Sequence, residues 1–264
     1  MLSDMIKGLI IGVSMLIPGV SGGTVAIIFG IYYKLIIAVD TFLEDPKKNI
    51  KILASVAIGG VIGVLAFSKP VLLIYNTYKI PMLYLFMGAV LGSVPLLFKS
   101  AGIKKVKPKM FVYPIIGLLC VILVEQIPKD MFSVETEGLL GYAILFLVSI
   151  FLAIPLILPG ISFSYMLLIL GLYEPTLMAI HTLQIQFLLP MCLGIIIGIF
   201  ITAKIIRFVL KKYPLQTYLV IIGFVLASLK YIYPGTSTGN ELLISILSLL
   251  VGFFIIYKFS ENKN

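Results

Sequence analysis

The chain has 264 residues, of which 61% are hydrophobic and 12% are charged. A soluble domain is about one quarter charged, and apolar runs recur here along the whole sequence. The composition therefore excludes a soluble enzyme or binding domain and indicates an all-helical, polytopic membrane protein. The net charge of +9 comes almost wholly from lysine, and we assign it to loops flanking the membrane rather than to a nucleic-acid surface. Two isolated cysteines and one histidine predict no metal site and no cofactor.

A polar break interrupts the first predicted element. The segments 5–17 and 25–39 each fit a helix of about 20 Å, which is shorter than the roughly 30 Å of membrane hydrocarbon. Between them lies the stretch "PGVSGGT", which begins at Pro18. Proline ends a helix because it lacks a backbone donor, and unpaired backbone groups are costly in lipid. We therefore expect a re-entrant hairpin, or a pair of short tilted helices, around a polar site.

Seven further hydrophobic segments follow, and the charges between them predict how the chain crosses the membrane. The segments are 50–68, 81–98, 110–126, 138–158, 186–203, 215–230 and 241–259. The stretches 99–109 and 204–212 are strongly basic, whereas 125–137 is acidic. Because loops rich in lysine and arginine stay in the cytoplasm, we expect the basic loops and both chain ends on the inner side of a bacterial cytoplasmic membrane, and the acidic loop outside.

An internal repeat relates the second half of the chain to the first. An offset of 141 residues matches Pro18, Ser21, Gly30 and Tyr32 with Pro159, Ser162, Gly171 and Tyr173. Further along, an offset of 135 matches Gly59, Gly63, Lys69 and Gly88 with Gly194, Gly198, Lys204 and Gly223. Because segments 50–68 and 186–203 are expected to cross in opposite directions, we predict two inverted repeats, 1–135 and 136–264. Each would hold a broken or re-entrant hairpin and about three transmembrane helices, as in many secondary transporters.

The two breaks form the predicted binding site, because such sites lie where matching breaks meet near the middle of the membrane. Free N–H groups at a helix N-terminus attract anions, and serine and threonine are good N-caps, so phosphate or carboxylate is the expected ligand. The candidate contacts are Pro18, Gly19, Ser21, Gly22, Gly23, Thr24, Pro159, Gly160, Ser162 and Ser164. Candidate cationic contacts are Lys69, Lys204 and Arg207. The carboxylates Asp40 and Glu174 are candidates for proton coupling.

Other interpretations of the breaks stay open. Small residues also permit close helix packing in membranes. The stretch Gly19–Gly23 matches G-x-S-x-G, a serine-nucleophile pattern, which raises the alternative of an intramembrane serine hydrolase. That pattern needs a strand-turn-helix context that is missing here, and a Ser–His dyad would have to use His181, the single histidine. The second copy has Phe163 after Ser162 and has lost the pattern, so binding is favoured over hydrolysis.

The paired stretches "PGVSGGTVAIIFGIY" and "PGISFSYMLLILGLYEP" resemble those of the bacterial undecaprenyl phosphate translocase family PopT, over essentially the whole chain. The resemblance implies a flippase, not an enzyme, that returns undecaprenyl phosphate from the outer to the inner leaflet for reuse in peptidoglycan and other envelope polymers. It also implies that the family's second motif includes Gly171, Tyr173 and Glu174. Phe163 stands where the family pattern has glycine, so we expect an asymmetric pair of phosphate contacts. A carrier of another organic anion or phosphate is the alternative within transport.

Overall fold

The computed structural model describes residues 1–16, 20–103, 107–126, 138–161, 163–236 and 238–261. These residues form twelve α-helices and one short 3₁₀ helix, and no strand occurs among them. The first half holds α1 (Leu2–Met15), α2 (Gly22–Ile28), α3 (Tyr32–Asp40), α4 (Pro46–Thr77), α5 (Lys79–Ser100), η1 (Pro108–Phe111) and α6 (Val112–Glu125). The second half holds α7 (Gly138–Ile157), α8 (Phe163–Ile169), α9 (Tyr173–His181), α10 (Ile185–Lys212), α11 (Pro214–Ile232) and α12 (Gly239–Glu261).

The predicted all-helical membrane fold is confirmed. Among the described residues, five helices are long and apolar enough to cross a membrane: α4, α5, α7, α10 and α12. The helices α6 and α11 are apolar but shorter, and the bent pair of α2 and α3 passes the same test if it is counted as one span. Each hydrophobic segment expected from the sequence corresponds to one helix, except 25–39, which forms two. The acidic loop expected at 125–137 lies almost wholly outside the described residues.

The segment 25–39, predicted as one helix, is divided at Gly30, so that prediction was wrong. The axes of α2 and α3 are inclined at 114°. Gly30 has a left-handed φ of +63°, its N–H donates to the Ile27 carbonyl, and the N–H of Ile31 donates to the Ala26 carbonyl. This is the Schellman pattern of a helix end, which favours glycine because the conformation is strained for other residues. It stops α2 after about two turns.

The second half reproduces this local structure. Gly171 has a φ of +64°, its N–H donates to the Leu168 carbonyl, and the N–H of Leu172 donates to the Leu167 carbonyl. The bounds of α8 and α9 therefore follow those of α2 and α3 at the offset of 141. Shortly afterwards, the hydroxyls of Thr41 and Thr182 donate to the backbone carbonyls four residues before them.

Helix packing is repeated as well. A Cβ atom on Gly59 of α4 would overlap the Met5 carbonyl of α1, and one on Gly194 of α10 would overlap the Phe146 carbonyl of α7. The glycines differ by 135 and their partners by 141, the two offsets found in the sequence. The helix pairs α5–α12 and α11–α6 also correspond, through Gly88 on Leu249 and Gly223 on Pro114, and here the glycines and their partners are both 135 residues apart. These contacts support the repeat, and the division into 1–135 and 136–264 stays a prediction.

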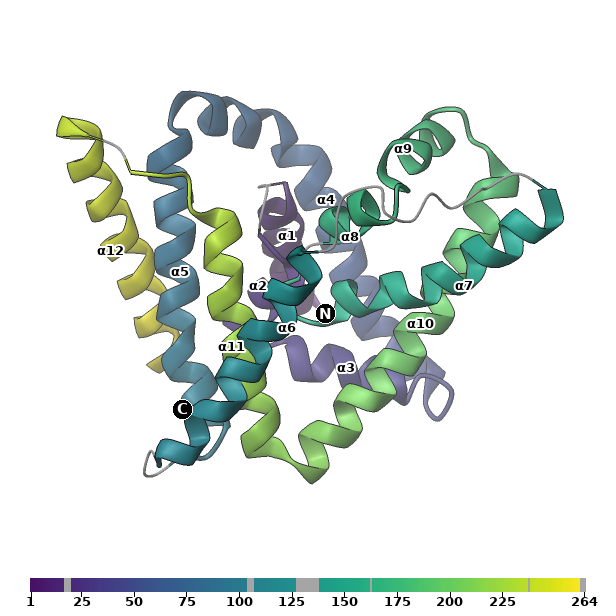
Figure 1. The fold of residues 1–264 in the computed structure, drawn as a ribbon, viewed down its shortest axis with the longest axis horizontal. Coiled ribbons are helices and arrows are strands. Elements are labelled where there is room, and N and C mark those ends of the chain that lie inside the picture. The colour runs from purple at the N-terminus through teal and green to yellow at the C-terminus, as the bar shows by residue number, and fades with distance from the viewer. Residues whose placement is uncertain (17–19, 104–106, 127–137, 162, 237, 262–264) are drawn as a thin grey trace.

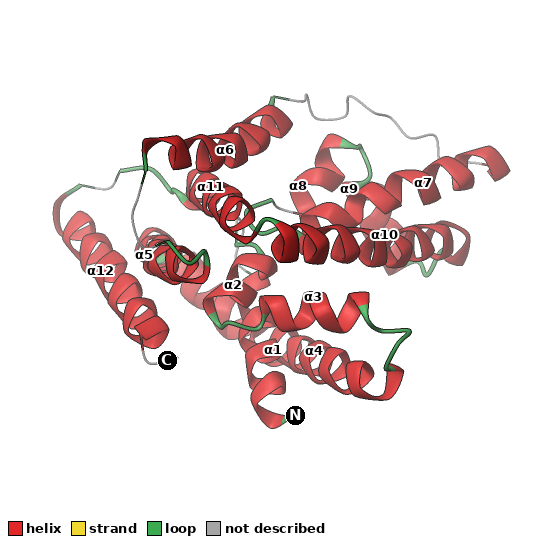
Figure 2. Ribbon diagram, turned by 90° about the horizontal axis from the view of Figure 1, so that it is seen from below, coloured by secondary structure: helices red, strands yellow, loops and turns green. Residues whose placement is uncertain are grey.

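The helices form two groups with α1 and α2, which flank the first break, between them. Figure 1 shows α5, α11 and α12 on one side, α7, α9 and α10 on the other, and α1 and α2 in the middle. In the view of Figure 2, α3 lies between α10 and the α1–α4 pair, and it packs on both α10 and α4. This arrangement places the start of α2 at the centre of the molecule.

Candidate functional site

A cavity of about 380 Å³ lies where the two halves meet. The first half contributes side chains from α1, α2, α3 and α4, and the second half contributes them from α7, α8 and α10. Ser21, Gly22 and Gly23 of the first break line it, and Phe163 lines it from the second. The volume is within the range of small-molecule pockets, about 300–1,000 Å³. The cavity is therefore the candidate site.

The two breaks touch at this cavity. A Cβ atom on Gly23 would lie 3.3 Å from the Ile157 carbonyl oxygen and 3.3 Å from the Cα of Pro159. The next residue, Gly160, packs so closely on α11 that a Cβ atom there would overlap the Phe224 carbonyl. Glycine at position 23 therefore lets the backbones of the two halves meet, as the sequence predicts for matching breaks, and Gly160 lets the second break pack on α11 of its own half.

Ser21 is the N-cap residue of α2, with an extended backbone (φ −88°, ψ 129°). Its side chain makes no capping hydrogen bond to the helix. Ser21 also lines the cavity. The first backbone N–H groups of any helix have no partner within it. Donors at the start of α2 are therefore available to a ligand. Because α2 has only seven residues, its individual N–H donors contribute more to anion binding than a helix dipole does.

Two buried hydroxyl groups near the cavity have no hydrogen-bond partner. They are the hydroxyls of Thr24, which is 2% exposed, and Tyr32, which is 7% exposed. Tyr32 lines the cavity from α3, and Thr24 follows the lining residue Gly23 in α2. A buried polar atom without a partner costs about 1–3 kcal/mol, and most such atoms in native proteins are paired. Tyr32 in the cavity wall and Thr24 beside it are therefore candidate hydrogen-bond donors to a polar ligand group.

The remaining lining is apolar, and no charged side chain belongs to the described lining. Lys69 and Lys204, the repeat-matched candidates, are exposed on α4 and α10 and do not line the cavity. Arg207 lies outside the lining too, where it forms an ion pair with Asp40. Glu174 is exposed in the first turn of α9. The structure thus brings the glycine and serine candidates together and keeps the charged ones apart from them.

Some predicted contacts cannot be placed. Pro18, Gly19 and Ser162 lie outside the described residues, and the side chain of Ser164 does as well. Conversely, Tyr32, Ile11 and Met15 line the cavity, although none of them was predicted as a contact from the sequence. The match of Tyr32 with Tyr173 at the repeat offset was the available signal for the first of these. The apolar residues carried no signal, because their types are common throughout the chain.

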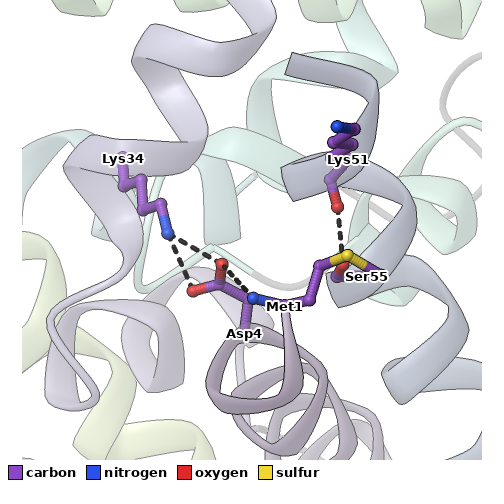
Figure 3. Close-up of polar contacts among 5 residues, drawn as sticks. All are labelled: Met1, Asp4, Lys34, Lys51 and Ser55. Carbon is purple, nitrogen blue, oxygen red and sulfur yellow. Dashed lines mark hydrogen bonds and ion pairs between the residues drawn. The ribbon is translucent and has the colours of Figure 1, made fainter. Parts of the chain in front are cut away.

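A second polar cluster fixes α3 to α1. Lys34 Nζ donates to both carboxylate oxygens of Asp4, over 2.9 and 2.8 Å. Figure 3 shows the two side chains pointing toward each other, with the N-terminal amine of Met1 beside the carboxylate. The hydrogen bond from Lys34 lowers the pKa of Asp4, which lies outside the candidate spans. This carboxylate therefore remains ionised near neutral pH and does not act as a proton carrier there.

Apolar spanning helices and a bent helix pair define a multi-pass membrane protein, and a cavity of ligand size lies at its first break. The chain belongs to the undecaprenyl phosphate translocase-like family, whose model matches residues 11–245. It is 30% identical over 267 residues to the polyprenyl-phosphate transporter of Staphylococcus aureus, covering 96% of this chain and 93% of that protein. It is 29% identical over 259 residues to the polyprenyl-phosphate transporter of Vibrio cholerae, covering 90% and 79%. No solved structure matches the chain.

Proposed function

We propose that this protein is a flippase that returns undecaprenyl phosphate from the outer to the cytoplasmic leaflet of the bacterial cell membrane. There the lipid carrier is reused for peptidoglycan and other envelope polymers. The family and the names of both relatives support a polyprenyl phosphate as substrate. The observation that carries the proposal is the cavity at the break, because it combines unpaired polar donors with an apolar wall.

The two parts of the substrate suit the two kinds of lining. The phosphate lies beside Ser21, the first N–H groups of α2 and the Tyr32 hydroxyl, and each hydrogen bond to it contributes about 1.5–3 kcal/mol. The first isoprenoid units contact apolar side chains such as Ile11 and Leu53, while the rest of the tail stays in lipid. A lining without charged side chains favours this lipid over a small soluble anion, which would have to leave its whole hydration shell.

Two inverted repeats, 1–135 and 136–264, would expose the cavity to each side of the membrane in turn. Repeated helix bounds and glycine contacts support this division. Moving a negative charge inward against the membrane potential costs about 2.3 kcal/mol per 100 mV. Inward movement of a proton or another cation would offset that cost. Glu174 is the better of the two carboxylate candidates, because Asp40 is engaged by Arg207.

Ligand binding by the purified protein tests the proposal. Undecaprenyl phosphate at about 100 times its Kd should raise the free energy of unfolding by about 2.7 kcal/mol, whereas undecaprenol should give a much smaller shift. Ser21→Ala should remove most of the phosphate-dependent part. Ser68→Ala, at a serine of α4 outside the cavity lining, is the matched control and should keep it.

Equal shifts with undecaprenyl phosphate and undecaprenol would contradict a phosphate site. A full shift with inorganic phosphate alone would instead favour a carrier of soluble anions.

A further inference from the structure

Helix α3 joins the two halves at one end of the molecule. The carboxylate of Asp40, the last residue of α3, forms an ion pair with Arg207 of α10. Just beyond the helix, the ring of Phe42 meets Phe200 of α10 edge to face, with centroids 6.1 Å apart. Figure 2 shows α3 lying beside α10. Because α3 also carries Tyr32 of the cavity wall, this contact holds one wall of the cavity against the second half.

Separate contacts fix α3 within its own half. Lys34 pairs with Asp4 of α1, as Figure 3 shows. Asn49 of α4, which is 4% exposed, donates to the Thr41 carbonyl over 2.7 Å. The helix is therefore anchored to α1 and α4, and Asp40 supplies its ion pair to α10. A movement of α10 away from α3 would break that ion pair and leave both anchors intact.

The equivalent contact in the second half is missing. The repeat sets α9 in the position of α3, but α9 makes no comparable contact with α4 among the described residues. At the two repeat offsets, Phe42 corresponds to Leu183 and Phe200 to Leu65. The two phenylalanines are partly buried, whereas Leu183 is 72% exposed and Leu65 is 74% exposed. The phenylalanines are thus in contact, whereas the equivalent leucines are both exposed.

The junction after α9 is unusual in its backbone. Leu183 has a φ of +53° and is the one non-glycine residue in the described part of the chain with a positive φ. L-residues with side chains rarely adopt this conformation. Such residues often mark segments that switch between arrangements. Leu183 lies between α9 and α10, where a change of backbone conformation would reorient α9 relative to α4.

The charges of the α3–α10 contact are not repeated in the sequence. The offsets match Asp40 with His181 and Arg207 with Leu72. An ion pair like that of Asp40 and Arg207 can therefore form at one end only. Closure of α9 on α4 would therefore lack an ion pair at these two positions.

We propose that the cavity has two gates, of which the structure shows one closed and one open. The closed gate is α3 against α10, held by Asp40–Arg207 and Phe42–Phe200. The second gate closes when α3 and α10 separate, and it brings Leu183 of α9 against Leu65 of α4. Asp40 and Arg207 are positioning residues that determine which gate is closed. With 204–212 on the cytoplasmic side, as its charge predicts, the structure is the outward-facing state.

The use of these gates rests on the proposed transport function, but their existence can be tested without any substrate. Cys120 and Cys192, both free, are first replaced by alanine. One double variant then carries Phe42→Cys with Phe200→Cys, and another carries Leu65→Cys with Leu183→Cys. A third, Leu65→Cys with Leu139→Cys, is the control. Leu139 is also accessible to the reagent, since it is 88% exposed, but it lies at the start of α7, which belongs to neither gate. Cross-linking by a short bifunctional thiol reagent is measured in native membranes.

Both gate pairs should cross-link above the control pair, each in a different fraction of the molecules. Adding Asp40→Asn should shift the ratio of the two yields roughly fivefold toward Leu65–Leu183, the size expected for a partly exposed ion pair. Exchanging the charges, with Asp40→Arg and Arg207→Asp, should return the ratio toward that of the parent. This second variant separates loss of the ion pair from damage to the fold.

A Leu65–Leu183 pair that never exceeds the control, with or without Asp40→Asn, would overturn the second gate. An unchanged ratio in Asp40→Asn would overturn the role of the ion pair. Neither result depends on undecaprenyl phosphate, so failure of the gates and failure of the transport function are distinguishable.

Discussion

A Cβ atom placed on Gly23 would lie 3.3 Å from the Cα of Pro159, so the two broken segments meet backbone to backbone. These residues belong to different halves of the chain and stand at equivalent interruptions of their helices. A side chain at position 23 would therefore require the backbone of the second break to shift by a few tenths of an ångström. Any change at Gly23 therefore alters the second break as well as the first.

Alanine at Gly23 should impair transport far more than alanine at the neighbouring Gly22. At Gly23 the new methyl group meets backbone, which must shift, and overpacking of this kind costs about 1–3 kcal/mol. At Gly22 it meets the Sδ of Met15 at 3.0 Å, and this flexible side chain can move aside. We expect about a tenfold loss of transport rate for Gly23→Ala, which corresponds to about 1.4 kcal/mol. Equal losses in the two variants would contradict the close contact with Pro159.

Replacing Tyr32 by phenylalanine should have opposite effects on stability and on binding. Removing a buried hydroxyl without a partner should raise the free energy of unfolding of the ligand-free protein by about 1 kcal/mol. The affinity for undecaprenyl phosphate should fall about tenfold, because the hydroxyl no longer reaches the phosphate. Tyr84→Phe is the control: its hydroxyl donates to the Gly235 carbonyl over 3.2 Å, so stability should fall and affinity should stay unchanged. Thermal unfolding with and without lipid measures both quantities.

The glycine contacts between α1 and α4 predict a sharp difference between adjacent positions. A Cβ atom on Gly59 would overlap the Met5 carbonyl, whereas one on Gly60 would lie 3.6 Å from the Gly8 carbonyl oxygen, an ordinary contact. Gly59→Ala should therefore lower Tm by about 2–4 °C per kcal/mol of overpacking, while Gly60→Ala should leave Tm nearly unchanged. Gly194→Ala, at the equivalent position of α10, should behave like Gly59→Ala. A tolerated Gly194→Ala would argue against equivalent packing in the two halves.

The ion pair of Asp4 and Lys34 should not make transport depend on pH near neutrality. The hydrogen bond from Lys34 lowers the pKa of Asp4 below its ordinary value of 3.8. Its stabilising contribution is therefore complete above that value and is lost only as the pH falls through the lowered pKa. Asp4→Asn should reduce stability at pH 5 and pH 8 by the same amount and leave the shape of the transport profile unchanged. A profile that changes shape would show that Asp4 titrates in the working range.

Much of the site could be predicted because prolines and glycines act on the backbone locally. The break before α2, the matching break before α8 and their meeting point all follow from the paired motifs. The division at Gly30 was missed, since a glycine within an apolar run also fits a continuous helix. The local cap hydrogen bonds at Gly30 are compatible with the division, and the packing of α3 on α10, which depends on the tertiary structure, favours it.

Side-chain pairing was harder to predict than backbone shape. Asp40 and Arg207 were both singled out, one for protons and one for phosphate, but they are 167 residues apart and nothing in the sequence joins them. Because Lys69 and Lys204 match at the repeat offset, as the glycines do, the sequence made both lysines candidate contacts. Yet glycine matches reflect packing inside the fold, whereas these lysines lie on exposed surfaces, where long side chains can reach the headgroup region.

We propose that the protein moves undecaprenyl phosphate across the bilayer through the cavity at Ser21. Transfer of this lipid between leaflets in proteoliposomes tests it most directly, with wild type, Ser21→Ala and Ser68→Ala compared at equal protein content. Protein-dependent transfer that Ser21→Ala weakens about tenfold or more and Ser68→Ala leaves intact is the predicted result. Absence of protein-dependent transfer, with and without an imposed proton gradient, would contradict the claim.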